Sequence, residues 1–201
     1  MKLIVGLGNQ GSKYEGTRHN AGADLVSTLV KSKNLELKSE IKFFGSTAGL
    51  RFGDNDVRAL IPETFMNLSG QSIAALSNYY RILPSQILVA HDDLDLPVGT
   101  ARFKFGGGHG GHNGIRDVIN KLGNNSDFGR IRIGIGHPGN ASQVTEYVLA
   151  KAPTEEKLLH KMSIENALKW LPLVIGGEWG KAVTGLHSEP FSANMGTDHG
   201  I

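Results

Sequence analysis

The chain opens on Met1-Lys2-Leu3-Ile4-Val5-Gly6-Leu7, a short apolar run closed by glycine. This pattern predicts a strand buried in a sheet. The polar segment 8–19 predicts a loop, and apolar residues at helical spacing from Ala21 to Val30 predict a helix behind it. Strands and helices continue to alternate along the chain, with one predicted β-hairpin over 41–61. This order favours an α/β fold, built as a single three-layer domain with a mixed, twisted sheet flanked by helices.

Length and composition agree with one folded domain. The 201 residues are 39% hydrophobic and 20% charged, which are ordinary values for a globular protein. We expect the domain to span 1–187 and the aperiodic tail 188–201 to be mobile. The longest apolar run, 168–175, is less than half a membrane span, and no segment has the pattern of a targeting peptide. We therefore expect no membrane association and a cytoplasmic location.

Cysteine content and net charge exclude several classes of function. The chain has no cysteine, which excludes disulfides, thiolate catalysis and cysteine-based metal sites. Its 21 Lys and Arg residues nearly balance 19 Asp and Glu residues, for a net charge of +2. A nucleic-acid-binding role would therefore depend on a local basic patch.

The first glycine motif, Gly6-x-Gly8-x-x-Gly11, has the spacing of a dinucleotide-binding loop. In that motif the third glycine opens a helix, and an acidic residue follows about 20 positions later. Here the segment 12–17 is polar and aperiodic, and the acidic residue is missing. We therefore interpret these glycines as shaping the turn that presents Asn9.

A second glycine-rich stretch, Gly106–Gly114, contains six glycines and precedes a predicted helix. Such a loop can bind phosphate through backbone N–H groups, although the Gly-Lys-Ser/Thr ending of a triphosphate-binding loop is missing. His109 and His112, together with His91 and Asp92, offer imidazole and carboxylate ligands that suit zinc or manganese. From these residues alone, a substrate platform and a divalent-metal hydrolase are both open interpretations.

The motif Thr17-Arg18-His19-Asn20 lies at the start of the first predicted helix. A histidine can act as a general base when a carboxylate orients it. Asn9, Asp92 and the pair His112–Asn113 each come after a predicted strand, and the carboxyl ends of parallel strands meet at one edge of a sheet. We therefore expect these residues and His19 to converge on one crevice.

Basic residues alternate along two predicted strands. Arg102 and Lys104 are two positions apart, as are Arg130 and Arg132, so each pair shares a strand face. Together they predict a positive stripe beside the glycine-rich loop, which favours a phosphate-bearing substrate. A non-catalytic RNA-binding module that uses this stripe is the alternative.

Six separate segments together carry a family resemblance. They are Ile4-Val5-Gly6-Leu7-Gly8-Asn9, Thr17-Arg18-His19-Asn20, Phe65-Met66-Asn67-x-Ser69-Gly70, His91-Asp92-Asp93-Leu94-Asp95, Gly106–Gly114 and Arg132-Ile133-Gly134-Ile135-Gly136-His137-Pro138. In this order the chain resembles bacterial peptidyl-tRNA hydrolase from about Lys2 to Gly185. The resemblance implies an esterase that cuts the bond between a peptide and the 3′ ribose of tRNA, so that the tRNA can be reused.

By position in these motifs, the resemblance also implies roles for individual residues. His19 corresponds to the catalytic histidine and Asp92 to the carboxylate that orients it. The amides that hold the substrate and the attacking water correspond to Asn9, Asn67 and Asn113. Other substrate-crevice positions correspond to Tyr14, Met66 and His112. The pair that clamps the 5′-phosphate end of the tRNA corresponds to Lys104 and Arg132.

The resemblance requires no metal or other cofactor. It implies peptidyl-tRNA as the partner, bound through its acceptor stem and 3′ end, and a monomeric enzyme. The sequence has no Gly-x-Ser-x-Gly nucleophile motif, which favours direct attack by water. Gln10 stands where the family usually has proline, so we expect a less rigid loop beside Asn9. After Leu186 the chain matches no family pattern, and we expect His187 and His199 to be exposed.

Overall fold

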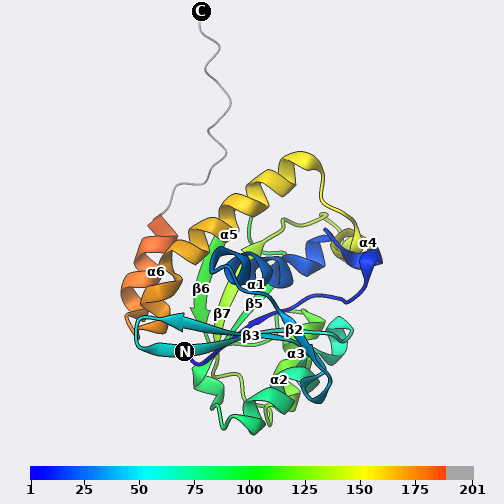
Figure 1. The fold of residues 1–201 in the computed structure, drawn as a ribbon. Coiled ribbons are helices and arrows are strands. Elements are labelled where there is room, and N and C mark those ends of the chain that lie inside the picture. The colour runs from blue at the N-terminus through cyan, green and yellow to red at the C-terminus, as the bar shows by residue number, and fades with distance from the viewer. Residues whose placement is uncertain (189–201) are drawn as a thin grey trace, which may run out of the picture.

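The structure, a computed structural model, describes residues 1–188. Within this range one mixed sheet has seven strands in the order β2-β3-β4-β1-β5-β7-β6 (Figure 1). The strands are β1 Leu3–Gly6, β2 Lys38–Glu40, β3 Gly45–Phe52, β4 Asn55–Pro62, β5 Ile87–Asp93, β6 Ala101–Phe105 and β7 Gly129–Gly134. The neighbours β4, β1, β5 and β7 run parallel, whereas β2, β3 and β6 pair antiparallel.

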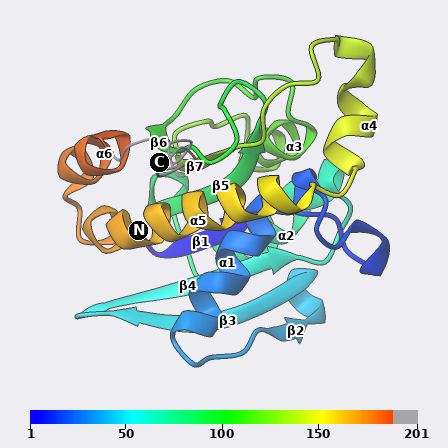
Figure 2. The ribbon, with the colours of Figure 1, turned by 90° about the horizontal axis from the view of Figure 1, so that it is seen from above.

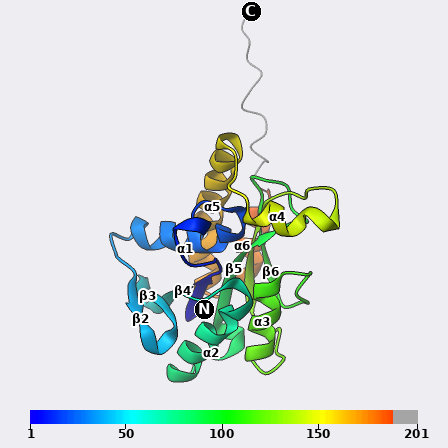
Figure 3. The ribbon, with the colours of Figure 1, turned by 90° about the vertical axis from the view of Figure 1, so that its right-hand side faces the viewer.

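Helices cover both faces of this sheet. They are α1 Ala21–Ser32, α2 Ser69–Tyr79, α3 Asn113–Lys121, α4 Val144–Leu149, α5 Thr154–Ile175 and α6 Trp179–Ser188. Figures 1 and 3 show α1, α5 and α6 on one side of the sheet and α2 and α3 on the other. The predicted fold class, a three-layer α/β domain around a mixed sheet, is confirmed.

Two hydrophobic cores explain why the first strand is a continuous apolar run. Ile4 packs in the core shared with α1 and α5, while its neighbours Leu3 and Val5 pack in the core shared with α2 and α3. Successive strand residues point to opposite faces, so a strand covered on both faces must be apolar at every position. Each such side chain, fully buried, stabilises the fold by about 1.5–3 kcal/mol.

Close packing of α1 on the sheet brings the 8–20 segment to the carboxyl end of β5. A Cβ on Gly22 would lie 2.1 Å from the carbonyl oxygen of Ala90, and a Cβ on Gly6 would lie 2.3 Å from the carbonyl oxygen of Gly22. Only glycine permits this approach, because real Cβ contacts are essentially never shorter than 3.0 Å. Figure 2 shows α1 and α5 lying across the central strands.

Some local predictions differ from the structure. The first predicted hairpin strand begins at Gly45 rather than at residue 41, because 41–43 form a 3₁₀ turn that ends in the left-handed residue Phe44, with φ 51°. A proline inside a helix is expected to end or kink it, yet α5 continues past Pro172 to Ile175. The predicted tail lies outside the described residues, apart from Ser188, which is the last residue of α6. In the described part of the chain, no helix is both long and apolar enough to cross a bilayer.

Candidate active site

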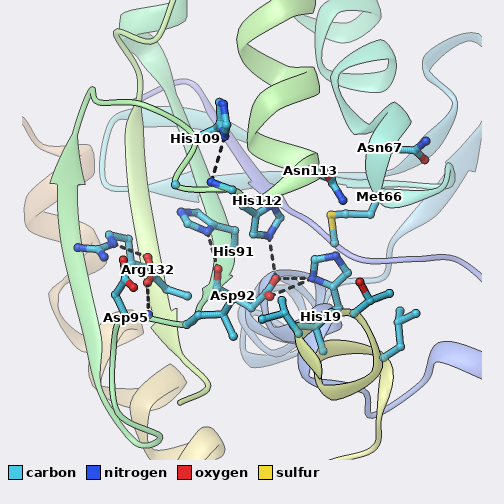
Figure 4. Close-up of a pocket in the computed structure, with 18 of the residues that line it drawn as sticks. His19, Met66, Asn67, His91, Asp92, Asp95, His109, His112, Asn113 and Arg132 are labelled. Carbon is cyan, nitrogen blue, oxygen red and sulfur yellow. Dashed lines mark hydrogen bonds and ion pairs between the residues drawn. The ribbon is translucent and has the colours of Figure 1, made fainter. Parts of the chain in front are cut away.

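A crevice with a volume of about 730 Å³ lies at the carboxyl ends of the parallel strands. All ten residues predicted to bind substrate or carry out catalysis line it. They are Asn9, Tyr14, His19, Met66, Asn67, Asp92, Lys104, His112, Asn113 and Arg132. The predicted convergence of these separate segments is therefore what the structure shows, and Figure 4 displays most of them around one space.

At the centre of the crevice, His19 lies beside Asp92. The Nδ1 atom of His19 donates to both carboxylate oxygens of Asp92, at 2.9 Å each. A neutral imidazole carries one proton, so this bond leaves Nε2 of His19 as the basic nitrogen. The Asp92 side chain is 3% exposed and that of His19 is 12% exposed. The pair is therefore nearly enclosed by protein, with the imidazole on the side of the crevice.

His112 binds the same carboxylate, from above Asp92 in the view of Figure 4. Its Nδ1 accepts hydrogen bonds from the backbone N–H groups of Gly114 and Ile115, at 3.1 and 3.2 Å, which caps the N-terminus of α3. Because Nδ1 is an acceptor, the proton is on Nε2, which donates to Asp92 Oδ1 at 2.8 Å. The rings of His19 and His112 lie 5.0 Å apart.

These bonds keep Asp92 charged. Burial alone would raise the pKa of Asp92, but the charges and hydrogen bonds of His112 and His19 outweigh it and hold the pKa well below its usual range. Asp92 is therefore a carboxylate at neutral pH, fixed between two imidazoles. Such a group can orient a general base and stabilise the imidazolium that forms when the base takes a proton.

His91 precedes Asp92 but has a different environment. Its Nδ1 donates to the carbonyl oxygen of Asp92 at 2.7 Å, and its side chain is buried. Burial, together with the nearby charge of His112, lowers the pKa of His91 to about 3 despite Asp92. His91 is therefore uncharged at neutral pH, and its ring packs edge-on against His112 at 5.1 Å.

The amide of Asn9 is oriented by two contacts. Its side-chain oxygen accepts from the backbone N–H of Met66 at 2.8 Å, so its NH₂ group is directed to other partners. Its backbone is held by Asn20, whose amide accepts from Asn9 N at 2.8 Å and donates to Asn9 O at 3.0 Å. Although Asn20 directly precedes α1, its side chain makes no capping bond to that helix. It positions the Asn9 turn instead.

Two further amides lie on other elements around the crevice. Asn113 is the first residue of α3, and its side-chain oxygen accepts from Arg116 Nη1 at 2.9 Å. Its NH₂ group is therefore the part presented to a ligand. Asn67 is exposed on the 3₁₀ turn Met66–Leu68 and lines the crevice. Tyr14, which ends another 3₁₀ turn, lines it as well.

The β6–β7 pair carries the four basic residues on one face. The strand register places Arg102 opposite Arg132 and Lys104 opposite Arg130. Their environments differ, however. Lys104 is exposed, and Arg132 is half-buried with its Nε bound to Asp93 Oδ2 at 2.5 Å. Arg130 is buried and bound to the glycine-rich loop. The predicted stripe therefore consists of residues with distinct partners.

The metal ligand set considered from the sequence is not the one that the structure gathers. In residues 1–188 the cluster with metal-ligand geometry is His19, Asp92 and His112, whose ligand atoms lie within 4.8 Å of one another. His109 points its Nδ1 at the backbone N–H of Gly111, and His91 points its Nδ1 at a carbonyl oxygen. In the cluster, both nitrogens that face Asp92 carry protons, which suits hydrogen bonding rather than ligation.

Comparisons with known proteins agree with the motifs. Residues 3–194 match the family model described as peptidyl-tRNA hydrolase. The chain is 55% identical to the peptidyl-tRNA hydrolase of Pseudomonas putida over 94% of its own length and 97% of the relative's. It is 53% identical to that of Teredinibacter turnerae, with the same coverage of both chains.

A solved structure shares the fold. The crystal structure of peptidyl-tRNA hydrolase from Acinetobacter baumannii superposes with a TM-score of 0.90 at 45% sequence identity. The match covers 94% of this chain and 95% of that one. The resemblance inferred from the six sequence segments is thereby confirmed, and with it the expectation of a hydrolase. The chain belongs to the peptidyl-tRNA hydrolase family.

Proposed function

We propose that this protein hydrolyses the ester bond between the peptide and the 3′ ribose of peptidyl-tRNA, with His19 as the general base. The observation that carries the proposal is the geometry of His19. Its Nδ1 is committed to Asp92 at 2.9 Å, so its Nε2 is free to accept a proton in the crevice. The relatives in Pseudomonas putida and Acinetobacter baumannii are named for this activity.

The reaction takes two proton transfers through the same nitrogen. Nε2 of His19 removes a proton from a water molecule while the water oxygen attacks the ester carbonyl, which forms a tetrahedral oxyanion. The carbon–oxygen bond to the ribose then breaks, and the imidazolium returns its proton to the ribose oxygen. Free tRNA and a peptide with a new carboxyl group leave. A positioned base of this kind contributes a rate factor of about 10²–10⁴.

Asp92 and the two asparagines assist this sequence. The Asp92 carboxylate stabilises the imidazolium, since its own pKa is held low by its two histidine partners. Asn113 and Asn9 have their side-chain oxygens engaged by Arg116 and Met66 N, so both direct N–H donors outward. We assign Asn113 to the oxyanion and Asn9 to the substrate and the attacking water. One such donor is worth a rate factor of about 10²–10³.

The remaining crevice residues bind the substrate. Met66, Tyr14 and His112 form the walls beside the ester, and Asn67 contacts the substrate at the rim. Lys104 and Arg132 bind the 5′-phosphate end of the tRNA, on the face of the β6–β7 pair next to the crevice. The enzyme acts as a monomer on the acceptor stem and 3′ end, and no metal or cofactor takes part.

The test is release of N-acetyl-aminoacyl groups from charged tRNA, in excess EDTA, with free aminoacyl-tRNA as a second substrate. We expect fast cleavage of the blocked substrate. His19→Ala should lose at least about 10²-fold in turnover while tRNA binding is retained. His187→Ala, which changes an exposed histidine on α6, is the matched control and should keep wild-type rates.

Other results would contradict particular parts of the proposal. Activity that is lost in EDTA and restored by zinc or manganese would make His19, Asp92 and His112 metal ligands. Wild-type turnover in His19→Ala would remove the base assignment. Tight, salt-sensitive tRNA binding without cleavage would leave only the RNA-binding module.

A further inference from the structure

Arg130 differs from the other cations on its face of the β6–β7 pair. It is 4% exposed, although it stands directly across from the exposed Lys104 and two residues from Arg132. Burial, and to a lesser extent the charge of Arg132, lower its pKa, and Asp93 opposes this. An arginine remains charged even when its pKa is lowered, so a cation is enclosed here beside a second one. Such an arrangement needs compensating contacts.

The compensating contacts come from the glycine-rich loop. Arg130 Nη1 donates to the carbonyl oxygen of Gly108 at 2.5 Å, and Nη2 donates to that of Gly107. The guanidinium also lies over the Phe128 ring, 4.8 Å from its centre. The backbone N–H of Gly106 donates to Phe128 O at 3.0 Å. The first half of the loop is therefore bound to the start of β7 by side-chain and backbone bonds.

The second half of the loop is held differently. Gly110 and Gly111 have left-handed backbones, with φ of 53° and 82°, and a Cβ on either would meet no atom of the described residues within 4 Å. His109 closes this turn on itself, since its Nδ1 accepts from Gly111 N and its carbonyl oxygen accepts from His112 N. The loop tip, 109–111, therefore projects from the segment Gly107–Gly108, which Arg130 holds in place.

The anchored segment Gly107–Gly108 lies against the side chain of Lys104. A Cβ on Gly107 would lie 3.1 and 3.2 Å from Cε and Nζ of Lys104, so the Lys104 side chain runs along the Gly107 backbone. Gly107, with φ 98°, holds a conformation that favours glycine. Because Arg130 fixes the position of Gly107, it also restricts the positions open to the Lys104 ammonium.

We propose that Arg130 is a positioning residue for substrate binding: it fixes Gly107–Gly108 against β7 and thereby places the Lys104 ammonium for the tRNA phosphate. The role of Lys104 rests on the proposed function, whereas the anchoring of the loop does not. Arg130 is thus a structural cation rather than a direct phosphate ligand, unlike Lys104 and Arg132.

The test compares Arg130→Lys with Arg102→Met in the full chain. Lysine keeps the charge but has a single nitrogen, so it cannot bond to both carbonyl oxygens. Hydrogen exchange of the amides in 106–112 should accelerate by about tenfold or more in Arg130→Lys. KM for N-acetyl-aminoacyl-tRNA should rise about fivefold or more, with kcat within about twofold. The slope of log(kcat/KM) against log salt should fall toward the value for Lys104→Met, because the displaced Lys104 ammonium no longer holds its phosphate.

Arg102→Met is the matched control. Arg102 lies on the same face, but its Nη1 bonds to the carbonyl oxygen of Ala101 and not to the loop. Its removal should leave loop exchange unchanged. Unchanged loop exchange in Arg130→Lys would overturn the proposal whatever the kinetics, and so would a salt slope that stays at the wild-type value. If Arg130→Lys fails to fold, Arg130 is a residue of the core and the proposal is also wrong. The exchange measurement needs no turnover, so it stands even if the proposed reaction is not observed.

Discussion

A single imidazole, that of His112, connects the fold to the chemistry. One ring nitrogen caps α3 and the other donates to Asp92. The cap forces the tautomer, because Nδ1 can accept the two backbone N–H groups only if the proton is on Nε2. The carboxylate that orients His19 is therefore itself oriented by the start of a helix.

Two substitutions at this position separate the two contacts. His112→Asn keeps a good capping side chain but cannot reach Asp92 with a ring nitrogen, whereas His112→Ala loses both. We expect the free energy of unfolding to fall by about 1–2 kcal/mol in His112→Ala and by less in His112→Asn. Both should lose kcat to a similar extent. Denaturant unfolding and turnover of the two variants check this, and equal stability losses would contradict a capping role.

Residues that lie within a recognisable sequence motif could be assigned to the crevice from the sequence. His19, Asp92 and Asn113 lie in recognisable segments, and they line the crevice as predicted. For two residues the motifs and patterns did not indicate the positioning role, although Asn20 lies in the same segment as His19. Asn20 has the character of a helix cap, but its partner Asn9 is 11 residues away. Arg130 was grouped with the other cations because alternation predicts a face and not the depth of burial along it.

At the scale of elements, the contact of α1 with β5 sets the geometry of His19 and Asp92. The helix follows directly after the turn that holds His19, and β5 ends in Asp93 directly after Asp92. Gly22 lies in the first turn of α1, where its missing side chain allows the backbone of Ala90 to approach. The close packing of α1 on β5 therefore fixes the distance between His19 and Asp92.

Gly22→Ala should disturb stability and activity together. The added Cβ would lie 2.1 Å from a backbone oxygen, so α1 must move away from β5 and carry His19 with it. We expect the free energy of unfolding to fall by about 1–3 kcal/mol and kcat to fall by about tenfold or more. Gly49→Ala on β3, where a Cβ would meet nothing within 4 Å among the described residues, should change stability by less than about 0.5 kcal/mol. Thermal unfolding and turnover of both variants measure the difference.

Elements with a clear apolar pattern were predictable, including the four-residue strand β1, whereas α4 was not. α1 and α3 follow their apolar spacing closely. α4 has six residues and one buried position, too few to show a period. Pro172 lies in the last turn of α5, where only the carbonyl oxygen one turn earlier loses its partner, so the helix reaches Ile175.

Across the whole molecule, buried ionisable groups outside the crevice affect how stability depends on pH. Asp24 on α1 faces a second cavity of about 290 Å³ between α1 and α5, and burial raises its pKa to about 6 although Lys31 opposes this. The folded state therefore binds this proton more tightly than the unfolded chain, whose pKa is 3.8. The stabilising contribution is complete below pH 4 and is lost as the pH rises through about 6.

Asp24→Asn should consequently stabilise the protein at alkaline pH and much less in acid. Asparagine has the same shape without the charge that must be buried. We expect the free energy of unfolding to rise by about 1–3 kcal/mol at pH 8, and the gain to shrink below pH 6. Denaturant unfolding at pH 5 and pH 8 measures both values. Asp127→Asn, at an exposed carboxylate, is the control and should show no pH-dependent difference. A gain in Asp24→Asn that is equal at both pH values would contradict burial of the charge as the cause.

Two adjacent carboxylates at the end of β5 fix the distance between two parts of the crevice. Asp92 and Asp93 are neighbours in one strand and point to opposite faces, one holding His19 and the other holding Arg132. In the proposed mechanism, His19 acts on the ester and Arg132 binds the phosphate. Both are held by carboxylates on two successive residues of one central strand. Because the strand cannot stretch, the distance between His19 and Arg132 is fixed. A substrate can contact both residues only if its ester and its 5′-phosphate are separated by a matching distance. Selectivity for tRNA would then arise from dimension as well as from chemistry.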